Sequence, residues 1–437
     1  MKFRKNRIII FIVLAAMSLL YVGCGKKDIS PHIASDGIRM ESSAKASSGA
    51  STEAPAPAVN GKVAMEVGTS LSDTAEFTAS KDASAPENHI QQNQQIASGQ
   101  LTAGEWKDFK NWDYWLNLLN NGEWKEYQSR WQFFTRKKLQ VIVKDGDKPV
   151  VDVKVYLLDK QGNILWTSKT DNKGVACLFP ELFSPGQNTV FDIIIEDGQN
   201  NVKLEDIKAS VSEPVYVDFK PIDDGSNILD LMFVVDTTGS MQDELDYLKA
   251  ELKNVIRRVD AEASQSLDIR LSCNYYRDQG DEYVVRPFPF TRDIDEVIND
   301  MNKQYADGGG DTPEAVVEAL QDAIENHQWS VDAGARLLFL VLDAPPHYTT
   351  ENVTELQNLI AKASAAGIRI IPVASSGIDK ETEALLRFFS ISTGGTYTFL
   401  TDHSGIGNDH IEPTIGDYQV ELLNDLLVRI IKDYTSK

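Results

Sequence analysis

Three separated stretches of the chain carry oxygen-bearing side chains in patterns that suit a hard metal ion. Asp236, Thr238 and Ser240 alternate directly after an apolar run, so on an extended chain they point the same way. Thr312 stands just before a helical pattern, and Asp343 follows another apolar run. Carboxylates and hydroxyls without Cys or His suit Mg²⁺ or Mn²⁺ and disfavour zinc. The sequence therefore predicts a metal site built from these five residues.

Each of these residues also has an ordinary structural explanation. Thr238 or Ser240 could cap the helix that follows. Thr312 with Pro313 at the first helical position is a good capping pair, and Asp343 could simply end a strand. These explanations account for single residues, but not for five of them in order at the ends of strands. We therefore favour the metal site.

Weaker candidates lie near these stretches. His347 could orient a ligand or water, although a packing or loop role is the better interpretation. Asp278 could act through water, or belong to a solvated loop beside Arg277. A further polar loop fits no strong metal motif and consists of Asp402, His403, Asp409 and His410.

The elements that must position the predicted site form an alternating pattern from residue 227 onward. Helical patterns, with a final one at 418–434, separate the apolar runs 228–235, 267–276, 283–290, 337–342, 368–374 and 396–400. Solid apolar runs are typical of strands buried on both faces. The alternation predicts an α/β fold, a doubly wound and mostly parallel sheet with helices on both sides. In such sheets, ligands bind beyond the carboxyl ends of the strands, where Asp236 and Asp343 stand.

These motifs resemble the metal-ion-dependent adhesion site of von Willebrand factor A (vWA) domains, over about residues 226–437. The residues concerned are Asp236-Thr-Thr-Gly-Ser240, Gly310-Asp-Thr312-Pro-Glu and Asp343. The resemblance implies that Thr238 and Ser240 bind the metal directly, and Thr312 directly or through water. It implies that Asp236 and Asp343 balance the metal charge. Thr238 stands where Ser is commoner, and it keeps the hydroxyl.

The resemblance favours a non-enzymatic module whose metal captures an Asp or Glu of a protein partner. A structural role in an envelope complex is an alternative. A metal-dependent hydrolase or phosphoryl-transfer protein is a less favoured one. A haloacid-type phosphatase needs a second Asp where Thr238 stands, and no nucleophile elbow, phosphate loop or His-Glu-x-x-His motif occurs.

The N-terminus predicts an exported, lipid-anchored protein of the bacterial envelope. Residues 8–22 are apolar, follow a basic start and are too few to span a bilayer as a helix, as in a signal peptide. The ending Leu20-Tyr-Val-Gly-Cys24 resembles a lipoprotein cleavage box, although Tyr21 is unusual there. The resemblance implies removal of residues 1–23 and lipidation of Cys24. Because Gly25 and not Asp follows Cys24, the resemblance also implies the outer membrane or cell surface, with the periplasmic face as an alternative. A plain signal peptide is the alternative to a lipoprotein.

The residues between the predicted signal peptide and the α/β domain divide into three predicted segments. Residues 24–103 are rich in small polar residues, with Phe77 as their only aromatic residue, and predict a flexible linker. Residues 104–136 hold five of the seven tryptophans at helical spacings, which favours a docked helical pair over a sugar-binding platform. Residues 137–222 alternate with period two between turn signals. They predict a small antiparallel β-sandwich that resembles carboxypeptidase-regulatory or Ig-like modules.

Composition narrows the classes of function. The chain has 437 residues, and Lys+Arg 43 against Asp+Glu 65 give a net charge of −22, so nucleic acid is a poor partner. Three cysteines exclude a disulfide scaffold, and Cys177 and Cys273 are expected to be buried thiols. The oligomeric state does not follow from the sequence.

Overall fold

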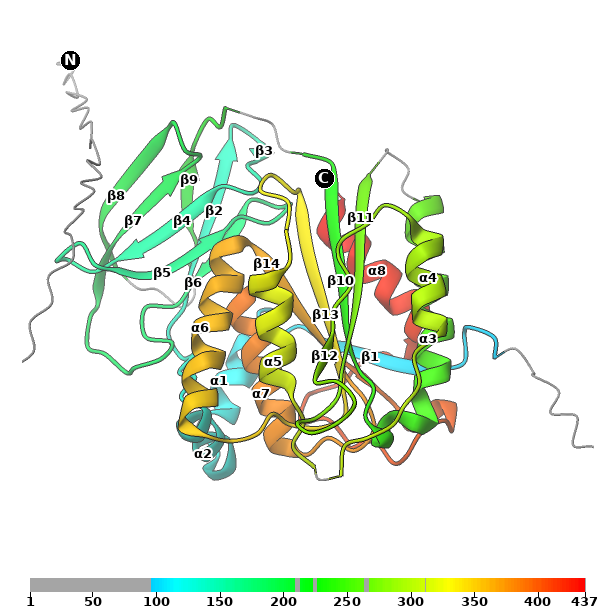
Figure 1. The fold of residues 1–437 in the computed structure, drawn as a ribbon. Coiled ribbons are helices and arrows are strands. Elements are labelled where there is room, and N and C mark those ends of the chain that lie inside the picture. The colour runs from blue at the N-terminus through cyan, green and yellow to red at the C-terminus, as the bar shows by residue number, and fades with distance from the viewer. Residues whose placement is uncertain (1–95, 209–212, 223–225, 263–266, 311, 437) are drawn as a thin grey trace, which may run out of the picture. The chain divides into compact units, whose positions relative to one another are not determined.

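The structure is a computed structural model that describes residues 96–436, apart from residues 209–212, 223–225, 263–266 and 311 (Figure 1). The predicted signal peptide, Cys24 and nearly all of the predicted linker lie outside the described residues. Among the helices that the structure describes, none is both long and apolar enough to span a bilayer.

An eight-stranded sheet organises the α/β domain. Its strands are β1 (Thr102–Trp106), β10 (Ile228–Asp236), β11 (Asp268–Tyr276), β12 (Val285–Arg286), β13 (Ala335–Leu342), β14 (Ile368–Ala374), β15 (Tyr397–Leu400) and β16 (Glu421–Leu422). They lie in the order β12-β11-β10-β13-β14-β15-β1-β16. The run from β11 to β15 is parallel, whereas β12, β1 and β16 pair antiparallel. The predicted mixed α/β fold with a mostly parallel sheet is confirmed.

Helices cover both faces of this sheet (Figure 1). They are α3 (Gln242–Glu262), α4 (Ile294–Asn302), α5 (Val316–Gln321), α6 (Thr350–Ala366), α7 (Lys380–Thr393) and α8 (Leu423–Thr435). On β10, Met232 and Val234 pack with α5, α6 and α7, while Leu231 and Phe233 pack with α3, α4 and α8. Because both faces of the central strands are buried, these strands are continuous apolar runs in the sequence.

Two predicted elements differ in the structure. The predicted strand at 283–290 shrinks to the two residues of β12, because Pro287 and Pro289 have no amide hydrogen for a strand ladder. The helix expected from Pro313 begins at Val316, with Ala315 as its N-cap, and passes into a π-helical turn over Asp322–Asn326.

The first strand of the sheet comes from residues far upstream of the others. β1 pairs with β15, where Ala103 lies opposite Leu400, and with β16. A Cβ atom at Gly104 would lie 2.5 Å from the ring of Phe399, so only glycine allows this close pairing. The boundary predicted between residues 103 and 104 therefore falls inside a strand of the α/β sheet. Residues 107–227 form an insertion between two strands of one sheet.

The segment that leads into β1 is held against α3. The side chain of Glu251, which is fully buried, accepts hydrogen bonds from the backbone N–H groups of Gly99 and Gln100 at 2.8 Å. It also accepts one from Leu101 at 3.2 Å. This carboxylate satisfies three successive donors and sets the direction in which the chain enters the sheet.

The tryptophan-rich segment folds into two helices that dock on α7. They are α1 (Trp112–Leu118) and α2 (Gly122–Trp131). Trp115 meets Phe388 edge to face with ring centroids 5.4 Å apart. Arg387, also on α7, is buried with its guanidinium 2.6 Å from Asp108. All five tryptophans of this segment are buried, so it has no exposed tryptophan row for stacking on sugars.

The rest of the insertion forms two four-stranded sheets. Their strands are β2 (Leu139–Asp145), β3 (Lys148–Pro149), β4 (Lys154–Leu158), β5 (Ile164–Lys169), β6 (Val175–Leu178), β7 (Val190–Glu196), β8 (Asn201–Lys208) and β9 (Val215–Asp218). One sheet has the order β3-β2-β6 with β9 beside β2, and the other β5-β4-β7-β8. The expected purely antiparallel pairing is wrong for β9, which runs parallel to β2 because the chain crosses from one sheet to the other after β8.

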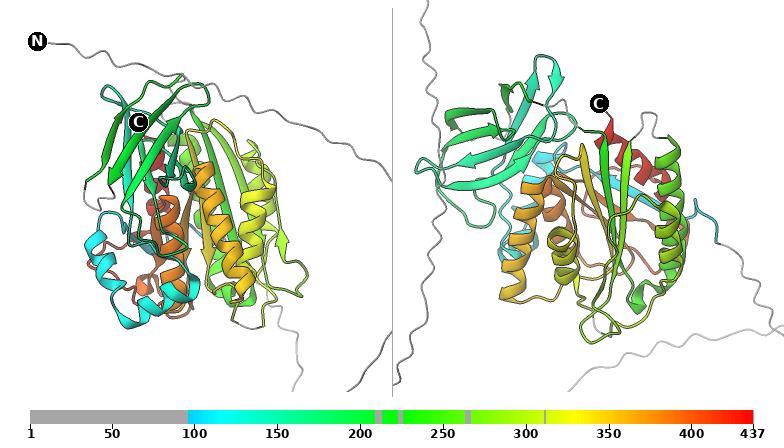
Figure 2. Two further views of the ribbon diagram at one scale, coloured as in Figure 1. Left: turned by 90° about the vertical axis from the view of Figure 1, so that its left-hand side faces the viewer. Right: turned by 45° about the horizontal axis from the view of Figure 1, so that its top comes forward.

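Buried polar contacts join the small sheets to the α/β domain, and Figure 2 shows β5 beside α6. The hydroxyl of Ser364 on α6 donates to the carbonyl of Thr167 on β5 at 3.0 Å. Asp152 lies 2.6 Å from Arg336 of β13 and 2.9 Å from Lys169. These paired charges fix the insertion at the end of the sheet where β13 begins.

Candidate functional site

The predicted metal ligands lie at one edge of the large sheet. Asp236 is the last residue of β10, and Asp343 directly follows β13. The two strands are parallel neighbours, with Val235 opposite Val341. Their carboxyl ends therefore meet, as the fold requires of a ligand site in a parallel sheet.

The first loop turns its hydroxyls toward Asp236. Asp236 Oδ1 accepts hydrogen bonds from the backbone N–H of Thr238 at 2.8 Å and from its hydroxyl at 2.7 Å. The Thr238 and Ser240 hydroxyls lie 3.0 Å apart. Thr238 makes no side-chain cap to the short helix η1 (Gly239–Met241) that follows. The capping explanation therefore does not account for Thr238, whose hydroxyl joins the carboxylate and Ser240 instead.

Two buried carboxylate oxygens at this edge have no hydrogen-bond partner. They are Oδ2 of Asp236 and Oδ1 of Asp343, on side chains that are almost fully buried. Burial raises the pKa of both aspartates, and repulsion from Asp236 adds to the rise of the pKa at Asp343, which the Ser240 hydroxyl opposes. An unpaired buried carboxylate is costly, and a nearby cation offsets that cost. These oxygens and the two hydroxyls fit a hard divalent ion.

Thr312 stands apart from the other four residues. Its side chain is exposed, and within the described part of the chain it makes no hydrogen bond. The capping explanation does not apply to it either, because α5 has Ala315 as its N-cap. The structure thus brings together Asp236, Thr238, Ser240 and Asp343, whereas among the described residues no hydrogen bond links Thr312 to them.

A glycine-rich second loop packs closely against the first. The carbonyl of Gly308 accepts from the N–H of Gly239 at 3.2 Å. Gly309 has φ +72°, and a Cβ there would lie 3.0 Å from Glu314 Oε1 and 3.4 Å from Thr238 Cβ. Glycine is therefore required for this left-handed turn and for the approach of the two loops.

Glu314 is a site residue that sequence reasoning missed. Its side chain is buried, its Oε2 has no hydrogen-bond partner, and its backbone N–H donates to Pro345 at 2.9 Å. Burial, followed by repulsion from Asp236 and Asp278, raises the pKa of Glu314 to about 9. The available signal was a carboxylate directly before the buried run that begins at Ala315.

The weaker candidates near the site bond to each other. His347 Nε2 lies 2.7 Å from Asp278 Oδ1. This contact holds the loop after β13, which contains Asp343 and His347, against the residues that follow β11. The buried guanidinium of Arg277 donates to the carbonyl of Tyr305 at 2.9 Å. The side chains of Asp278 and His347 thus bond to each other and join the two loops that carry them.

The polar loop at 402–410 reaches α3. His410 Nδ1 lies 2.8 Å from Asp402 Oδ1, and His410 Nε2 lies 3.2 Å from Glu244, a buried carboxylate of α3. His403 and Asp409 are exposed. Within the part of the chain that the structure describes, no three His, Cys, Asp or Glu side chains form a group that could hold a metal ion. Cys177 and Cys273 are free and buried, as predicted.

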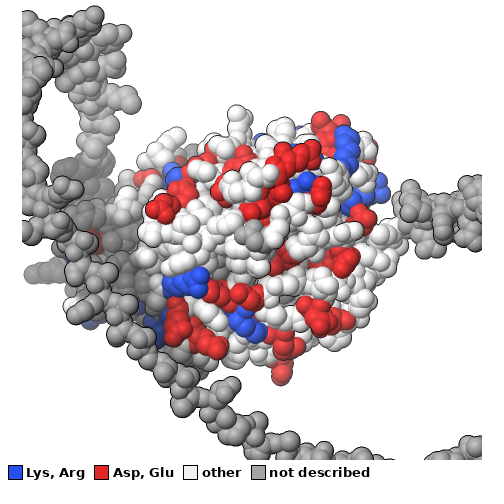
Figure 3. All heavy atoms as spheres, turned by 60° about the horizontal axis from the view of Figure 1, so that its bottom comes forward, with Lys and Arg blue, Asp and Glu red and all other residues white. Residues whose placement is uncertain are grey.

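The face that carries the strand ends is acidic. Asp and Glu side chains occupy more of this face than Lys and Arg do (Figure 3). The side chain of Asp307 in the second loop is 69% exposed, and that of Glu282 is 57% exposed. The surroundings of the candidate metal site are therefore acidic, like the chain as a whole, whose net charge is −22.

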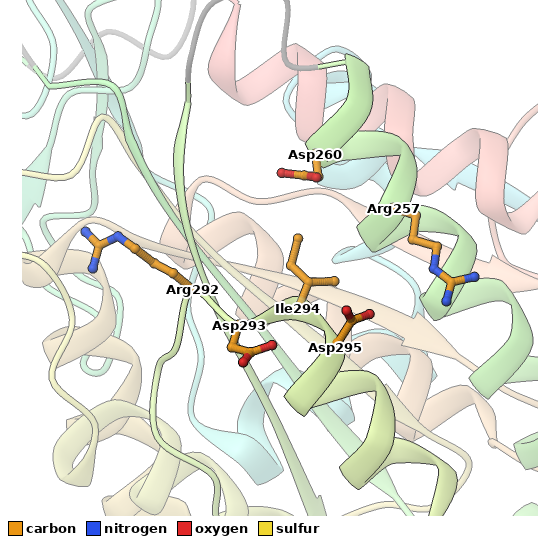
Figure 4. Close-up of a pocket in the computed structure, with 6 residues that line it drawn as sticks. All are labelled: Arg257, Asp260, Arg292, Asp293, Ile294 and Asp295. Atoms are coloured by element: carbon orange, nitrogen blue, oxygen red, sulfur yellow. The ribbon is translucent and has the colours of Figure 1, made fainter.

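A separate hollow lies between the end of α3 and the start of α4 (Figure 4), lined by Arg257, Asp260, Arg292, Asp293, Ile294 and Asp295. Arg292 pairs with Asp268 at 2.5 Å, and Asp293 caps α4 by accepting from the N–H of Glu296 at 3.0 Å. Arg292 and Asp293 therefore have structural roles as an ion-pair partner and a helix cap.

Comparison with known proteins agrees with the geometry. Residues 230–405 match the family model of the von Willebrand factor A domain. The chain is 32% identical over 129 residues to a putative ariadne-like RING finger protein of Acanthamoeba polyphaga mimivirus, covering 29% of this chain and 12% of that protein. It is 30% identical over 139 residues to an alpha-protein kinase of Dictyostelium discoideum, covering 32% of this chain and 22% of that protein.

The matched stretch spans less than a quarter of either relative. What these relatives share with the chain is therefore a segment and not their whole architecture. The chain contains a vWA domain at residues 230–405, a type of domain that commonly serves protein interaction. All five predicted ligands fall within that range.

Proposed function

We propose that the vWA domain binds Mg²⁺ or Mn²⁺ at a metal-ion-dependent adhesion site and captures a carboxylate of a protein partner. The ligands are Asp236, Thr238, Ser240, Thr312 and Asp343. The single observation that carries the proposal is the pair of buried, unpartnered oxygens on Asp236 and Asp343 beside two converging hydroxyls. A hard divalent ion offsets exactly this kind of unpaired negative charge.

The protein's own residues would each have a separate task. Asp236 orients the Thr238 hydroxyl through the 2.7 Å hydrogen bond, and Thr238 in turn lies beside Ser240. Asp343 adds the second negative charge from the neighbouring strand. The bound ion would supply a positively charged position at which an Asp or Glu of the partner replaces water.

Calorimetric titration of Mg²⁺ and Mn²⁺ into the chain tests the metal site. We expect binding by the wild type and its loss in Asp236→Ala and Asp343→Ala. Asp332→Ala is the matched control, because Asp332 is an exposed carboxylate near the start of β13. Heats that are absent in the wild type, or unchanged in both site variants, contradict the proposal.

The proposed location is the bacterial envelope, with the chain anchored through a lipid on Cys24. The apolar run at 8–22 and the residues before Cys24 support this anchor. Labelled palmitate should enter the wild type, and Cys24→Ala should release the protein from membranes. An unlabelled wild-type protein would show that the lipoprotein assignment is wrong.

The proposed role is non-enzymatic. The names of the kinase and RING finger relatives describe those proteins, of which the matched segment covers 22% and 12%. A partner within the envelope would make the same metal contact a structural one. Crosslinking in intact cells followed by co-purification separates capture of an external partner from assembly within the envelope.

A further inference from the structure

Carboxylates around the proposed metal site outnumber the charge of one divalent ion. Glu314 interacts electrostatically with Asp236, Asp278, Asp281 and Asp343, which makes a cluster of five carboxylates in all. One divalent ion of charge +2 does not balance five carboxylates. The metal alone therefore does not make the site attractive to an anion at a distance.

The basic side chains that the structure places nearby are already engaged. The guanidinium of Arg277 is buried, and it lies 3.6 Å from Glu282 and 3.9 Å from Asp307. His347 is hydrogen-bonded to Asp278 at 2.7 Å. Arg286 also lies 3.4 Å from Glu282, so Arg277 and Arg286 already offset part of the negative charge of Glu282 and Asp307.

Exposed carboxylates continue the negative charge outward from the metal loops. Asp307 precedes Gly308, whose carbonyl bonds to Gly239 beside the first-loop hydroxyls. Asp243 is exposed in the first turn of α3, three residues after Ser240. With Glu282 they form what we call the acidic rim.

We propose that the captured carboxylate belongs to a partner segment flanked by Lys or Arg, and that the acidic rim pairs with those cations. This inference rests on the proposed function. The cluster repels a partner segment that carries only a carboxylate. A segment with flanking cations is attracted to the acidic rim, which offsets this repulsion. The metal contact then selects the carboxylate, and the rim selects its neighbours.

Fluorescence anisotropy with synthetic peptides and the full chain in Mg²⁺ tests the inference. The probes are Lys-Lys-Gly-Glu-Gly-Lys-Lys, the same peptide with Gln for Glu, and a version with Ser for each Lys. We expect the Lys-flanked Glu peptide to bind at least about 10-fold more tightly than the Ser-flanked one at low salt. High salt should shrink this difference, because the rim is exposed and screened.

A pair of rim substitutions assigns the effect to this face. The double variant Asp243→Asn/Asp307→Asn should weaken the Lys-flanked peptide by about 3- to 10-fold and leave the Ser-flanked peptide unchanged. Asp147→Asn/Asp332→Asn makes the same change in net charge with two exposed residues outside the metal loops, and should change affinity by less than about 2-fold. Unchanged Mg²⁺ heats show that the rim variant keeps its metal site.

The outcomes separate the inference from the proposed function. Equal, metal-dependent binding of the Lys- and Ser-flanked Glu peptides overturns the inference alone. Equal binding of the Glu and Gln peptides, or binding that chelator leaves intact, overturns carboxylate capture and the inference with it. Mg²⁺ uptake without binding of any peptide also overturns both.

Discussion

The two ends of β10 carry buried aspartates in opposite situations. Asp230 and Asp236 are both fully buried on the same strand. Asp230 accepts from the backbone N–H of Ser330 at 2.5 Å and from its hydroxyl at 3.0 Å, and it lies 3.2 Å from Arg270. Asp236 accepts from the N–H and hydroxyl of Thr238 through Oδ1 and interacts with the buried Tyr276 hydroxyl, while among the described residues its Oδ2 lacks a close hydrogen-bond partner.

This difference separates structural charge from functional charge. At the first end, Asp230 is paired within the domain, and nearby Asp152 joins the insertion to Arg336 and Lys169. At the other end, Asp236, Asp343 and Glu314 repel one another, and among the described residues neither Asp236 nor Asp343 pairs with Lys or Arg. Removing one partner of a buried charge pair is destabilising, whereas a buried charge that lacks partners favours the binding of a proton or a cation.

Replacing Asp230 should have the largest effect on stability. Asp230→Asn removes the charge that balances Arg270 and should lower the free energy of unfolding by about 3 kcal/mol. Asp236→Asn in chelator should change it by less than about 1 kcal/mol, since it relieves an unpaired buried charge. Urea denaturation measures both. Equal destabilisation by the two variants would break the comparison.

Metal should stabilise the wild type only by binding at the end of β10 that carries Asp236. With Mg²⁺ at 100 times its dissociation constant, we expect a gain of about 2.7 kcal/mol, seen as a rise in Tm relative to chelator. Asp230→Asn should keep this gain although its baseline is lower, and Asp236→Asn should lose it. Thermal unfolding with and without Mg²⁺ measures the four cases. A gain that survives in Asp236→Asn would place the metal elsewhere.

The two threonines of the predicted site should differ in importance. Thr238 is buried and bonded to Asp236, whereas Thr312 is exposed and makes no hydrogen bond among the described residues. Thr238→Ala should weaken Mg²⁺ binding by about 10-fold, and Thr312→Ala by less than about 3-fold. Thr238→Ser, which keeps the hydroxyl, is the control. A larger loss in Thr312→Ala would mean that the second loop moves to the metal.

The smallest expected effect concerns His410, which contacts the buried carboxylate of Glu244 and changes its protonation state with pH. Burial lowers the pKa of His410, but hydrogen bonds with Glu244 and Asp402 outweigh burial and raise that pKa overall. The protonated histidine is therefore favoured in the folded state. Its stabilising contribution is present below the unfolded pKa of about 6.5 and is lost as pH rises through the higher folded pKa.

Stability curves of wild type and His410→Gln at several pH values test this titration. The difference between the two proteins should shrink as pH rises from about 6 to about 9. A difference that is constant across this range would mean that His410 contributes by packing and not by charge.

Local patterns revealed much of the domain and part of the site. The apolar runs of β10, β13 and β14 were visible because strands covered on both faces need no polar positions. The first loop was visible because alternate residues of an extended chain share a direction. Glu314 was missed because its role depends on Asp236, Asp278 and Asp343, which are distant in sequence and become its neighbours only in the fold.

The sequence by itself determined which segments form the central strands, and which side chains stand at their ends. Only the tertiary structure decided that β1 joins the same sheet, that Gly309 leaves room for Glu314 and Thr238, and that the side chain of Thr312 is exposed. Strand character and side-chain direction are properties of neighbouring residues. The pairing of Ala103 with Leu400 and the unpaired state of a buried oxygen depend on groups that only folding brings together.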